Sequence, residues 1–202
     1  MGYIDSGKDV QIDEGAIVGY NSIQKTREKF DEVVHIGDGT IIKAGAIVYA
    51  GVTIGKNCFI GHNTIIRENT IIGDNTNISH LVVIEGSVKI GSGCAIHPQC
   101  YIPEYTEIGN NVFMAAFCGM ANDTEMVFQR PHLITTKFRG PKIEDNVRVG
   151  CGVLLGANII IGKEAVIGMG AVVINDVASG TLVVGSPAKF MRFVDERTFI
   201  QK

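Results

Sequence analysis

The side chains best suited to proton transfer in this sequence are its histidines, because an imidazole titrates near neutral pH and can act as a general base. His62 and His80 are 18 residues apart, and His97 follows 17 residues after His80. Imidazoles are also common zinc ligands, so three of them could hold a metal ion instead. The choice between these two chemistries depends on which positions the fold brings together.

A six-residue repeat decides those positions. From Ile36 to Met120 an aliphatic residue or methionine recurs at every sixth position, and a small side chain stands four positions later in the hexads up to residue 118. A helix would repeat every 3.6 residues and an ordinary strand every 2. Period six instead fits a short strand plus a tight turn, which is the unit of a hexapeptide parallel β-helix.

The repeat therefore predicts an all-β prism with three sides. Three hexads form one 18-residue coil, so positions 18 apart stack about 4.8 Å from each other as neighbouring parallel strands. The bulky residue of each hexad fills the interior, and the small residue sits at the corner. We expect His62 and His80 to stack at one corner, with His97 diagonal to His80.

The repeat is interrupted in its C-terminal half. Residues 123–142 follow no hexad register and contain two prolines, and the repeat resumes at Ile143. Long unregistered segments in compact domains are usually functional, so we predict a loop extruded from one corner. Charged residues 24–32 interrupt a looser N-terminal repeat, and residues 189–202 leave the repeat as a short C-terminal tail. We expect a single domain over residues 1–202.

Composition excludes several classes of function. The formal net charge is −3, so the basic surface needed for nucleic acid is missing. No apolar run approaches the roughly 20 residues of a membrane span, and the N-terminus MGYIDSGKD lacks the features of a signal sequence. We therefore expect a cytoplasmic protein that binds neither nucleic acid nor membrane.

The positions of the cysteines indicate a role in core packing rather than in catalysis or disulfide formation. No CxxC motif is present, and four thiols occupy the small corner position of the hexads, where a free cysteine packs as a small apolar residue: Cys58, Cys94, Cys100 and Cys118. We predict that these four are reduced and buried. Cys151 lies off that position.

The hexads, the extruded loop and the closing run IGKEAVIGMGAVVINDVASGTLVVGSPAK resemble the hexapeptide-repeat acyltransferases. This resemblance implies a left-handed β-helix, a handedness that the periodicity alone does not fix. It also implies a homotrimer whose active sites lie between subunits, with acetyl-CoA or another acyl-CoA bound in the groove between adjacent prisms.

Two stretches are similar to the N-acyltransferases that modify nucleotide-linked amino sugars. One is the segment His80-Leu81-Val82-Val83-Ile84-Glu85, and the other is Asn122-Asp123 at the mouth of the loop, followed by Arg130-Pro131. The resemblance implies a CoA-dependent N-acyltransferase, typically an N-acetyltransferase, in which the amino group of the sugar attacks the thioester directly. It implies no metal.

The resemblance also implies roles for individual residues, each with an alternative. His80 is the candidate base, although the departing CoA thiolate could take the proton instead. Asn122 would lie beside the acceptor amine. Glu85 would orient the acceptor, or would pair with Arg67 one coil below it. Asp123 would hold an ammonium group, or would begin an Asx turn.

The remaining predicted contacts fall into two sets. The residues expected to bind the acceptor besides Asp123 are Arg130, His97 and His132. The residues expected to bind CoA are Gly168, Gly170, Ala171, Gly185, Pro187 and Lys189. Small residues permit close approach to pantetheine, but turn geometry alone also explains each glycine.

Other functions remain possible on the sequence alone. A γ-class carbonic anhydrase shares this fold and binds zinc through three histidines from two subunits, but its His-x4-His spacing is missing and His97 is followed by Pro-Gln-Cys-Tyr. An acyltransferase with a non-sugar acceptor and a catalytically silent β-helix are further alternatives.

Overall fold

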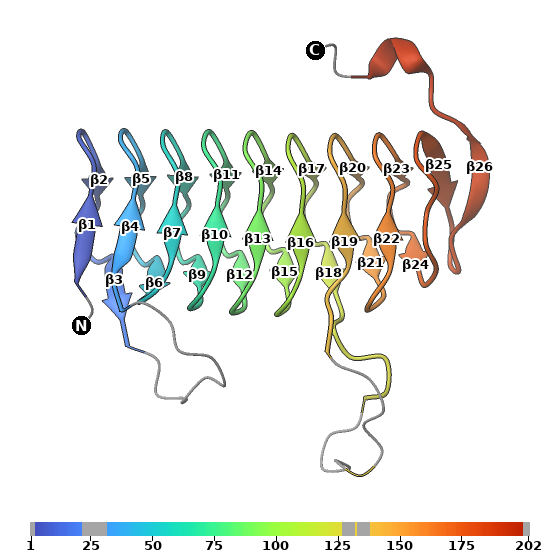
Figure 1. Ribbon diagram of the computed structural model, residues 1–202. Coiled ribbons are helices and arrows are strands. Elements are labelled where there is room, and N and C mark those ends of the chain that lie inside the picture. The colour runs from blue at the N-terminus through green and yellow to red at the C-terminus, as the bar shows by residue number, and fades with distance from the viewer. Residues whose placement is uncertain (1–2, 22–31, 127–131, 133–137, 200–202) are drawn as a thin grey trace.

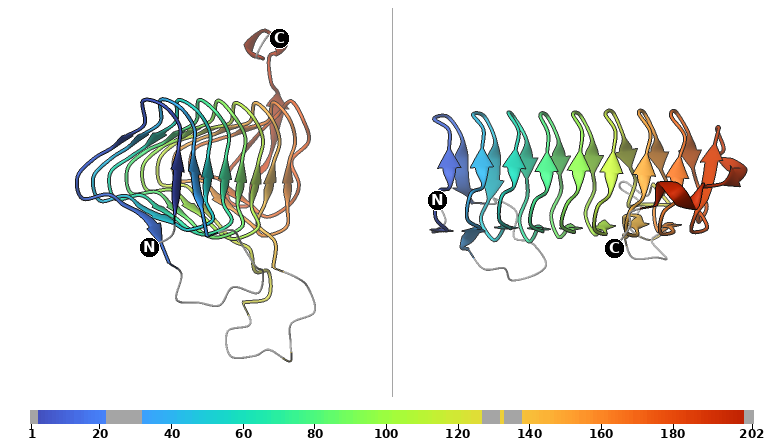
Figure 2. Two further views of the ribbon diagram at one scale, coloured as in Figure 1. Left: turned by 60° about the vertical axis from the view of Figure 1, so that its left-hand side comes forward. Right: turned by 90° about the horizontal axis from the view of Figure 1, so that it is seen from above.

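Short parallel strands wind into a three-sided prism (Figure 1, Figure 2). The computed structural model describes residues 3–21, 32–126, 132 and 138–199. Each side of the prism is one sheet, and successive strands of the chain belong to successive sheets. Strands that pair are therefore one coil apart, as in the register of Ile72 with Ile54 and Ile90.

We name the sheets A, B and C in the order in which the chain enters them. Sheet A contains β1 (Ile4–Ser6), β4 (Val34–Ile36), β7 (Thr53–Ile54), β10 (Ile71–Ile72), β13 (Lys89–Ile90), β16 (Glu107–Ile108), β19 (Lys142–Ile143) and β22 (Ile160–Ile161). Sheet B contains β2 (Gln11–Ile12), β5 (Ile41–Ile42), β8 (Phe59–Ile60), β11 (Asn77–Ile78), β14 (Ala95–Ile96), β17 (Phe113–Met114), β20 (Arg148–Val149), β23 (Val166–Ile167), β25 (Thr181–Val184) and β26 (Lys189–Phe193). Sheet C contains β3 (Ile17–Tyr20), β6 (Ile47–Tyr49), β9 (Ile65–Ile66), β12 (Val83–Ile84), β15 (Tyr101–Ile102), β18 (Gly119–Met120), β21 (Leu154–Leu155) and β24 (Val172–Val173).

The winding is left-handed, as the resemblance implied. In Figure 1 the chain rises through sheet A, crosses over the top to sheet B behind it, and returns along the bottom through sheet C while advancing to the right. The all-β fold predicted from the six-residue repeat is thereby confirmed. None of the described residues forms a helix long and apolar enough to cross a membrane.

The interior is the column of hexad residues that the sequence predicted. Ile54, Ile72 and Ile90 are 1%, 1% and 3% exposed, one above another in sheet A. Burial of each such side chain contributes about 1.5–3 kcal/mol relative to exposure. The small corner residues also link successive coils. Thr40 Oγ1 and Cys58 Sγ each donate a hydrogen bond to a carbonyl oxygen of the next coil, at 2.8 Å and 3.2 Å.

The three edges of the prism differ in character. The edge between sheets A and B, here called the far edge, is built from turns whose Asp and Asn side chains accept main-chain N–H groups of the preceding coil. Asp74 Oδ1 accepts from Lys56 N over 2.7 Å, and Asn110 Oδ1 accepts from Ser92 N over 2.9 Å. These bonds tie each coil to the next, so the far edge has a structural role.

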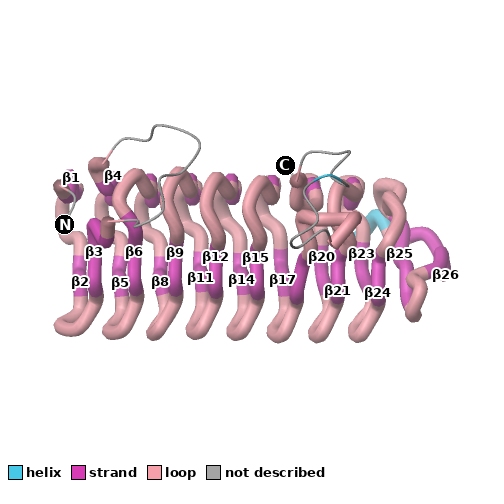
Figure 3. The backbone as a smooth tube through the Cα atoms, turned by 90° about the horizontal axis from the view of Figure 1, so that it is seen from below, coloured by secondary structure: helices cyan, strands magenta, loops and turns pink. Residues whose placement is uncertain are grey.

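The other two edges flank sheet C. The turns from sheet B to sheet C form one regular row along the molecule, which we call the histidine edge because His62 and His80 lie on it (Figure 3). The turns from sheet C to sheet A form the loop edge. There the chain leaves the coil twice, after β3 and again after β18, and it re-enters sheet A at β4 and at β19.

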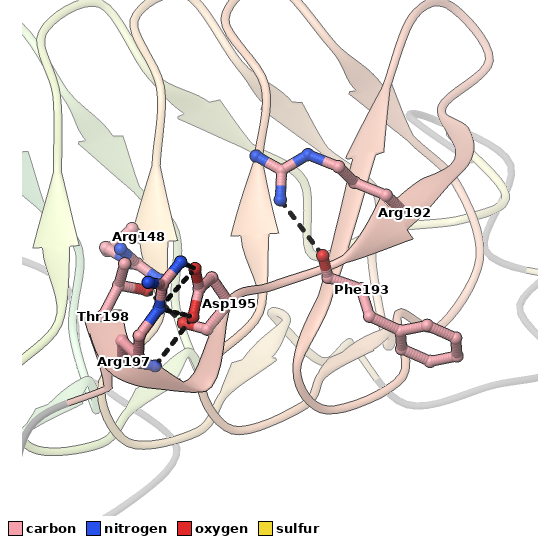
Figure 4. Close-up of polar contacts among 6 residues, drawn as sticks. All are labelled: Arg148, Arg192, Phe193, Asp195, Arg197 and Thr198. Carbon is pink, nitrogen blue, oxygen red and sulfur yellow. Dashed lines mark hydrogen bonds and ion pairs between the residues drawn. The ribbon is translucent and has the colours of Figure 1, made fainter.

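The tail leaves the repeat as predicted. Strand β26 turns back antiparallel to β25, and a 3-10 turn follows at Glu196–Thr198. Arg148 Nη2 donates to Thr198 Oγ1 over 3.2 Å, and Asp195 accepts hydrogen bonds from Arg197, so the tail is fixed beside sheet B (Figure 4). Residues 24–31 of the charged interruption lie outside the described residues.

Candidate functional site

The predicted histidine stack forms at the histidine edge. The rings of His62 and His80 lie 5.3 Å apart between centroids at an interplanar angle of 23°. His97 does not join them, because its ring packs edge-on against Phe113 at 5.0 Å. Among the residues that the structure describes, no three His, Cys, Asp or Glu side chains are grouped so that they could hold a metal ion.

His80 is held by a main-chain donor. The N–H of His62 donates to Nδ1 of His80 over 2.9 Å. This is the same contact that Asp74 makes with Lys56 at the far edge, where the acceptor side chain also stands 18 residues after the donor. An N–H donor requires a free lone pair on Nδ1, so the proton of the neutral His80 ring is on Nε2.

His62 has the opposite arrangement. Its Nδ1 lies 3.2 Å from the carbonyl oxygen of Ala44 in the coil below. A carbonyl oxygen only accepts hydrogen bonds, so Nδ1 of His62 carries the proton and Nε2 keeps its lone pair. The exposed His62 and the half-buried His80 therefore both leave Nε2 free of these bonds, as an acceptor in His62 and as a donor in His80.

Three bulky residues at the histidine edge have left-handed backbone conformations. Leu81, Gln99 and Phe117 have φ of 59°, 60° and 63°, at the turn position where many other coils carry Asn or Gly. Leu81 is 49% exposed and Phe117 is 62% exposed, so core packing does not account for them. Strained residues of this kind cluster at functional sites, so this edge is a candidate for ligand contact.

The residues predicted to bind CoA gather at the C-terminal end of the same edge. Gly170 has φ of 70°, and a Cβ added there would meet no atom within 4 Å. Gly185 has φ of 94° and lies in the hairpin that also holds the exposed Pro187, and Lys189 begins β26. The carbonyl of Gly185 accepts from Val172 N over 3.0 Å, which docks this hairpin on sheet C.

Two of those six positions have structural explanations. A Cβ on Gly168 would lie 2.6 Å from Val184 Cγ1, so close packing of β25 requires glycine there. Ala171 is fully buried, and its methyl group faces the core. Only the main chain of Ala171 could therefore approach pantetheine, and its role in binding CoA stays a prediction.

The loop edge carries the residues predicted to hold the acceptor. The carbonyl of Asn122 accepts from Arg139 N over 2.9 Å, which closes the base of the loop. Asp123 Oδ1 accepts from Glu125 N over 2.8 Å, so Asp123 forms the Asx turn that was its structural alternative. His132 is exposed, and Arg130 lies outside the described residues.

Glu85 makes the ion pair that was its alternative role. Arg67 Nη1 donates to Glu85 Oε2 over 2.9 Å, while Arg67 Nη2 and Nε bind the carboxylate of Glu68. The guanidinium also lies 5.6 Å above the ring centroid of Tyr49. Burial, together with the negative charges of Glu85 and Glu104, raises the pKa of Tyr101 nearby.

Within one chain, the structure does not bring His80 at the histidine edge together with Glu85 and Asn122 at the loop edge. His80 lies before sheet C and Glu85 after it, and five residues of extended chain span up to about 17 Å. Asn122 lies at the loop edge two coils beyond Glu85. The catalytic and positioning roles of these residues stay predictions.

Two hollows of the surface lie elsewhere. A cavity of about 550 Å³ on the sheet A side is lined by Lys89, Glu107 and Lys142, and one of about 580 Å³ lies beneath the tail near Lys163 and Phe193. Neither is lined by a predicted site residue. Neither therefore adds to the candidate site.

Sequence reasoning kept His62 only as one of several candidate bases or metal ligands, and it missed the residues in left-handed conformation. His62 had a signal, since it shares its column with His80. The turn register also held a signal for Leu81 and Phe117, because Asn and Gly occupy that place in many other coils. Nothing in the sequence indicated the opposite tautomers, because these depend on hydrogen bonds between coils.

Comparisons with known families agree with this architecture. The family described as "Bacterial transferase hexapeptide (six repeats)" matches residues 34–68, 51–86 and 69–104, and "Hexapeptide repeat of succinyl-transferase" matches residues 142–174. Together these matches cover just over half of the chain. The chain therefore belongs to the hexapeptide-repeat acyltransferases, which confirms the family and the enzyme class predicted from the sequence.

Comparison with solved structures gives one that shares the fold over nearly the whole chain, and others that are less similar. UDP-N-acetylglucosamine O-acyltransferase (LpxA) from Moraxella catarrhalis RH4 is 19% identical with a TM-score of 0.62, over 98% of this chain and 77% of that one. The N-acyltransferase AntD from Bacillus cereus, in complex with dTDP and 3-hydroxybutyryl-CoA, is 14% identical with a TM-score of 0.43, over 97% and 86%. Serine acetyltransferase (CysE) from Neisseria gonorrhoeae is 28% identical with a TM-score of 0.45, over 52% and 40%. Comparison with curated protein sequences gives no match.

Proposed function

We propose that this protein is a CoA-dependent N-acyltransferase that acylates the amino group of a nucleotide-linked amino sugar. The observation that carries the proposal is the composition of one edge. A pair of imidazoles, exposed side chains in strained turns and an open glycine turn at Gly170 follow one another along the histidine edge. An extended thioester substrate fits such a linear surface, with Lys189 at its end as a cation for the CoA phosphates.

The acceptor would bind at the loop edge. An amino sugar carries an ammonium group before it loses a proton, and carboxylates stabilise that charge. Glu85 is held in place by Arg67, and Asp123 stands at the mouth of the loop with Asn122 beside it. These side chains would orient the amine, while the loop would cover the rest of the acceptor.

The two edges would meet between copies of the chain, in a homotrimer. The residues of sheet C that face outward are nearly all apolar, namely Ile17, Ile47, Ile65, Val83, Tyr101, Leu154 and Val172. Sheet A instead presents charges at Lys89, Glu107 and Lys142. A partly apolar flat side favours association, and a heterologous contact around a threefold axis repeats one site three times.

The reaction needs alignment of two substrates, an acceptor for one proton and stabilisation of the oxyanion. The amine nitrogen attacks the thioester carbon, a C–N bond forms, and collapse of the tetrahedral intermediate breaks the C–S bond. The products are the amide and free CoA.

The test is release of CoA thiol from acetyl-CoA in the presence of a panel of nucleotide-linked amino sugars. The same sugars without the nucleotide, and nucleotide-linked sugars with a hydroxyl in place of the amine, are the controls. Acetyl-CoA at 100 times its dissociation constant should also stabilise the fold by about 2.7 kcal/mol. Absence of both thermal stabilisation and CoA release would refute the proposal.

A further inference from the structure

We infer that His62 and His80 act as a pair with divided roles in acyl transfer. His62 accepts the proton of the attacking amine at Nε2, and His80 donates a hydrogen bond from its own Nε2 to the thioester oxygen. The inference rests on the proposed function and assigns the proton to His62 rather than to His80, which was the candidate base.

The role of His80 follows from its main-chain contact. Because Nδ1 of His80 accepts the N–H of His62 over 2.9 Å, its lone pair is already used. The neutral ring offers one group to a ligand, the Nε2–H. A donor of this kind stabilises a developing oxyanion rather than removing a proton.

The role of His62 follows from the carbonyl below it. Ala44 O fixes the proton of His62 on Nδ1, at 3.2 Å, and no hydrogen bond to Nε2 is found among the described residues. The ring is therefore oriented by one nitrogen and open at the other, which is the arrangement of a general base.

The charged groups nearest His62 are Asp13 and Lys43, which are paired with each other over 2.6 Å. Asp13 is near enough that a charge on His62 contributes to the lowering of its pKa, after the larger effect of the hydrogen bond from Lys43.

The step balances with these two residues alone. As the amine attacks the thioester carbon, the carbonyl π electrons move to oxygen, which His80 Nε2–H binds. The amine proton moves to Nε2 of His62. The C–S bond then breaks, the C=O bond re-forms, and the CoA thiolate takes the proton from His62.

The first test reads the tautomers without any substrate. Long-range 1H–15N NMR of the imidazole nitrogens, on the whole protein near pH 8, is expected to show the proton of His80 on Nε2 and that of His62 on Nδ1. Assignment uses His62→Gln and His80→Gln, and His35→Gln is a matched control, because His35 lies on sheet A and contacts Asp5. The reverse tautomers would overturn the inference and leave the acyl transfer untouched.

The second test is the pH profile of CoA release. His62→Gln is expected to lower kcat by about 10²-fold and to abolish the acid limb of the profile. His80→Gln keeps an amide donor, so it should retain the acid limb and lose far less activity than His80→Ala, about tenfold against 10²-fold. His35→Gln should match the wild type.

Two kinetic results would overturn the inference: an acid limb that survives in His62→Gln, or a loss below tenfold in that variant. Absence of CoA release from the wild-type protein would refute the proposed function itself, and with it the inference. The NMR result separates these cases, because it requires no substrate.

Discussion

Arg67 and Glu85 stand 18 residues apart in the sequence, and a hydrogen bond of 2.9 Å from Nη1 to Oε2 joins them across one coil. The same guanidinium also binds Glu68, whose side chain is only 3% exposed. Arg67 thus neutralises a buried carboxylate and fixes the carboxylate that we place beside the acceptor. The Arg67 side chain therefore serves both the stability of the fold and the proposed acceptor site.

Replacing Arg67 with methionine should destabilise the fold. The change removes the cation of the buried Glu68 carboxylate, and loss of one partner of a buried ion pair costs about 3–5 kcal/mol. Urea unfolding measures the effect. Glu85→Gln is the matched control, because Glu85 is more exposed and its amide can still accept from Arg67, so its loss should be about 1 kcal/mol. Equal stability of Arg67→Met and wild type would contradict this account of Glu68.

Replacing Phe117 with asparagine should separate stability from activity. Phe117 has φ of 63° and is 62% exposed, so the exchange relieves backbone strain and loses little burial. The left-handed conformation costs roughly 1–2 kcal/mol for an ordinary residue, so we expect the midpoint of thermal unfolding to rise by about 2–4 °C. If Phe117 contacts acyl-CoA, KM for acyl-CoA should rise at the same time.

The control for Phe117 is the opposite exchange at the far edge. Asn75 has φ of 57°, and Asn75→Leu should lower the unfolding midpoint without changing KM. A Phe117→Asn variant that is less stable than wild type would show that the ring is held by packing rather than exposed to a ligand.

Alkylation should distinguish Cys151 from the other thiols. Cys151 is exposed on the histidine edge, and the remaining four cysteines are buried. Iodoacetamide at pH 8 should therefore modify Cys151 alone in the native protein, which mass spectrometry of peptides would locate. Acetyl-CoA should slow the modification, because its proposed track passes this residue. Unchanged labelling in saturating acetyl-CoA would place the ligand elsewhere.

Buried thiols should make stability depend on alkaline pH. Burial raises the pKa of Cys58 and Cys94, so the native state retains protons that the unfolded chain loses from about pH 8.5. The unfolded state then binds fewer protons, and the unfolding free energy falls as pH rises above that value. Chemical unfolding at pH 7 and pH 10 measures this dependence. The double variant Cys58→Thr and Cys94→Thr should show a weaker fall, because Thr40 makes the same hydrogen bond to the next coil. An identical pH dependence in the wild type and the double variant would refute the claim that Cys58 and Cys94 cause the loss of stability.

The fold was predictable from the sequence because its cause is local and repeated. A hexad places one bulky residue inward and one small residue at the corner, so the burial of Ile72 could be read from its position in the series. Stacking of His62 on His80 follows from the same arithmetic. The handedness came from family resemblance, since a six-residue period is compatible with either hand.

The site was less predictable because it depends on contacts that no period encodes. The sequence left Glu85 with two roles, and the hydrogen bond to Arg67 supplied the structural one. Ala171 is four residues after Ile167, at the inward corner where its side chain is buried, so its small size is explained by packing as well as by approach of a cofactor. The tautomers of His62 and His80 depend on main-chain groups that no residue type reveals.

The most direct test of the central claim is complementation between two inactive variants. We propose that the histidine edge of one copy works with the loop edge of its neighbour. His80→Ala and Asn122→Ala should each lower turnover strongly, and Asn122→Ala should leave the unfolding midpoint nearly unchanged. Co-expressed in equal amounts with different tags and purified as mixed trimers, they should recover about a third of the wild-type activity, because one site of the three in each mixed trimer then draws both intact residues from two different chains. Mixed trimers no more active than the two variants alone would contradict a shared site.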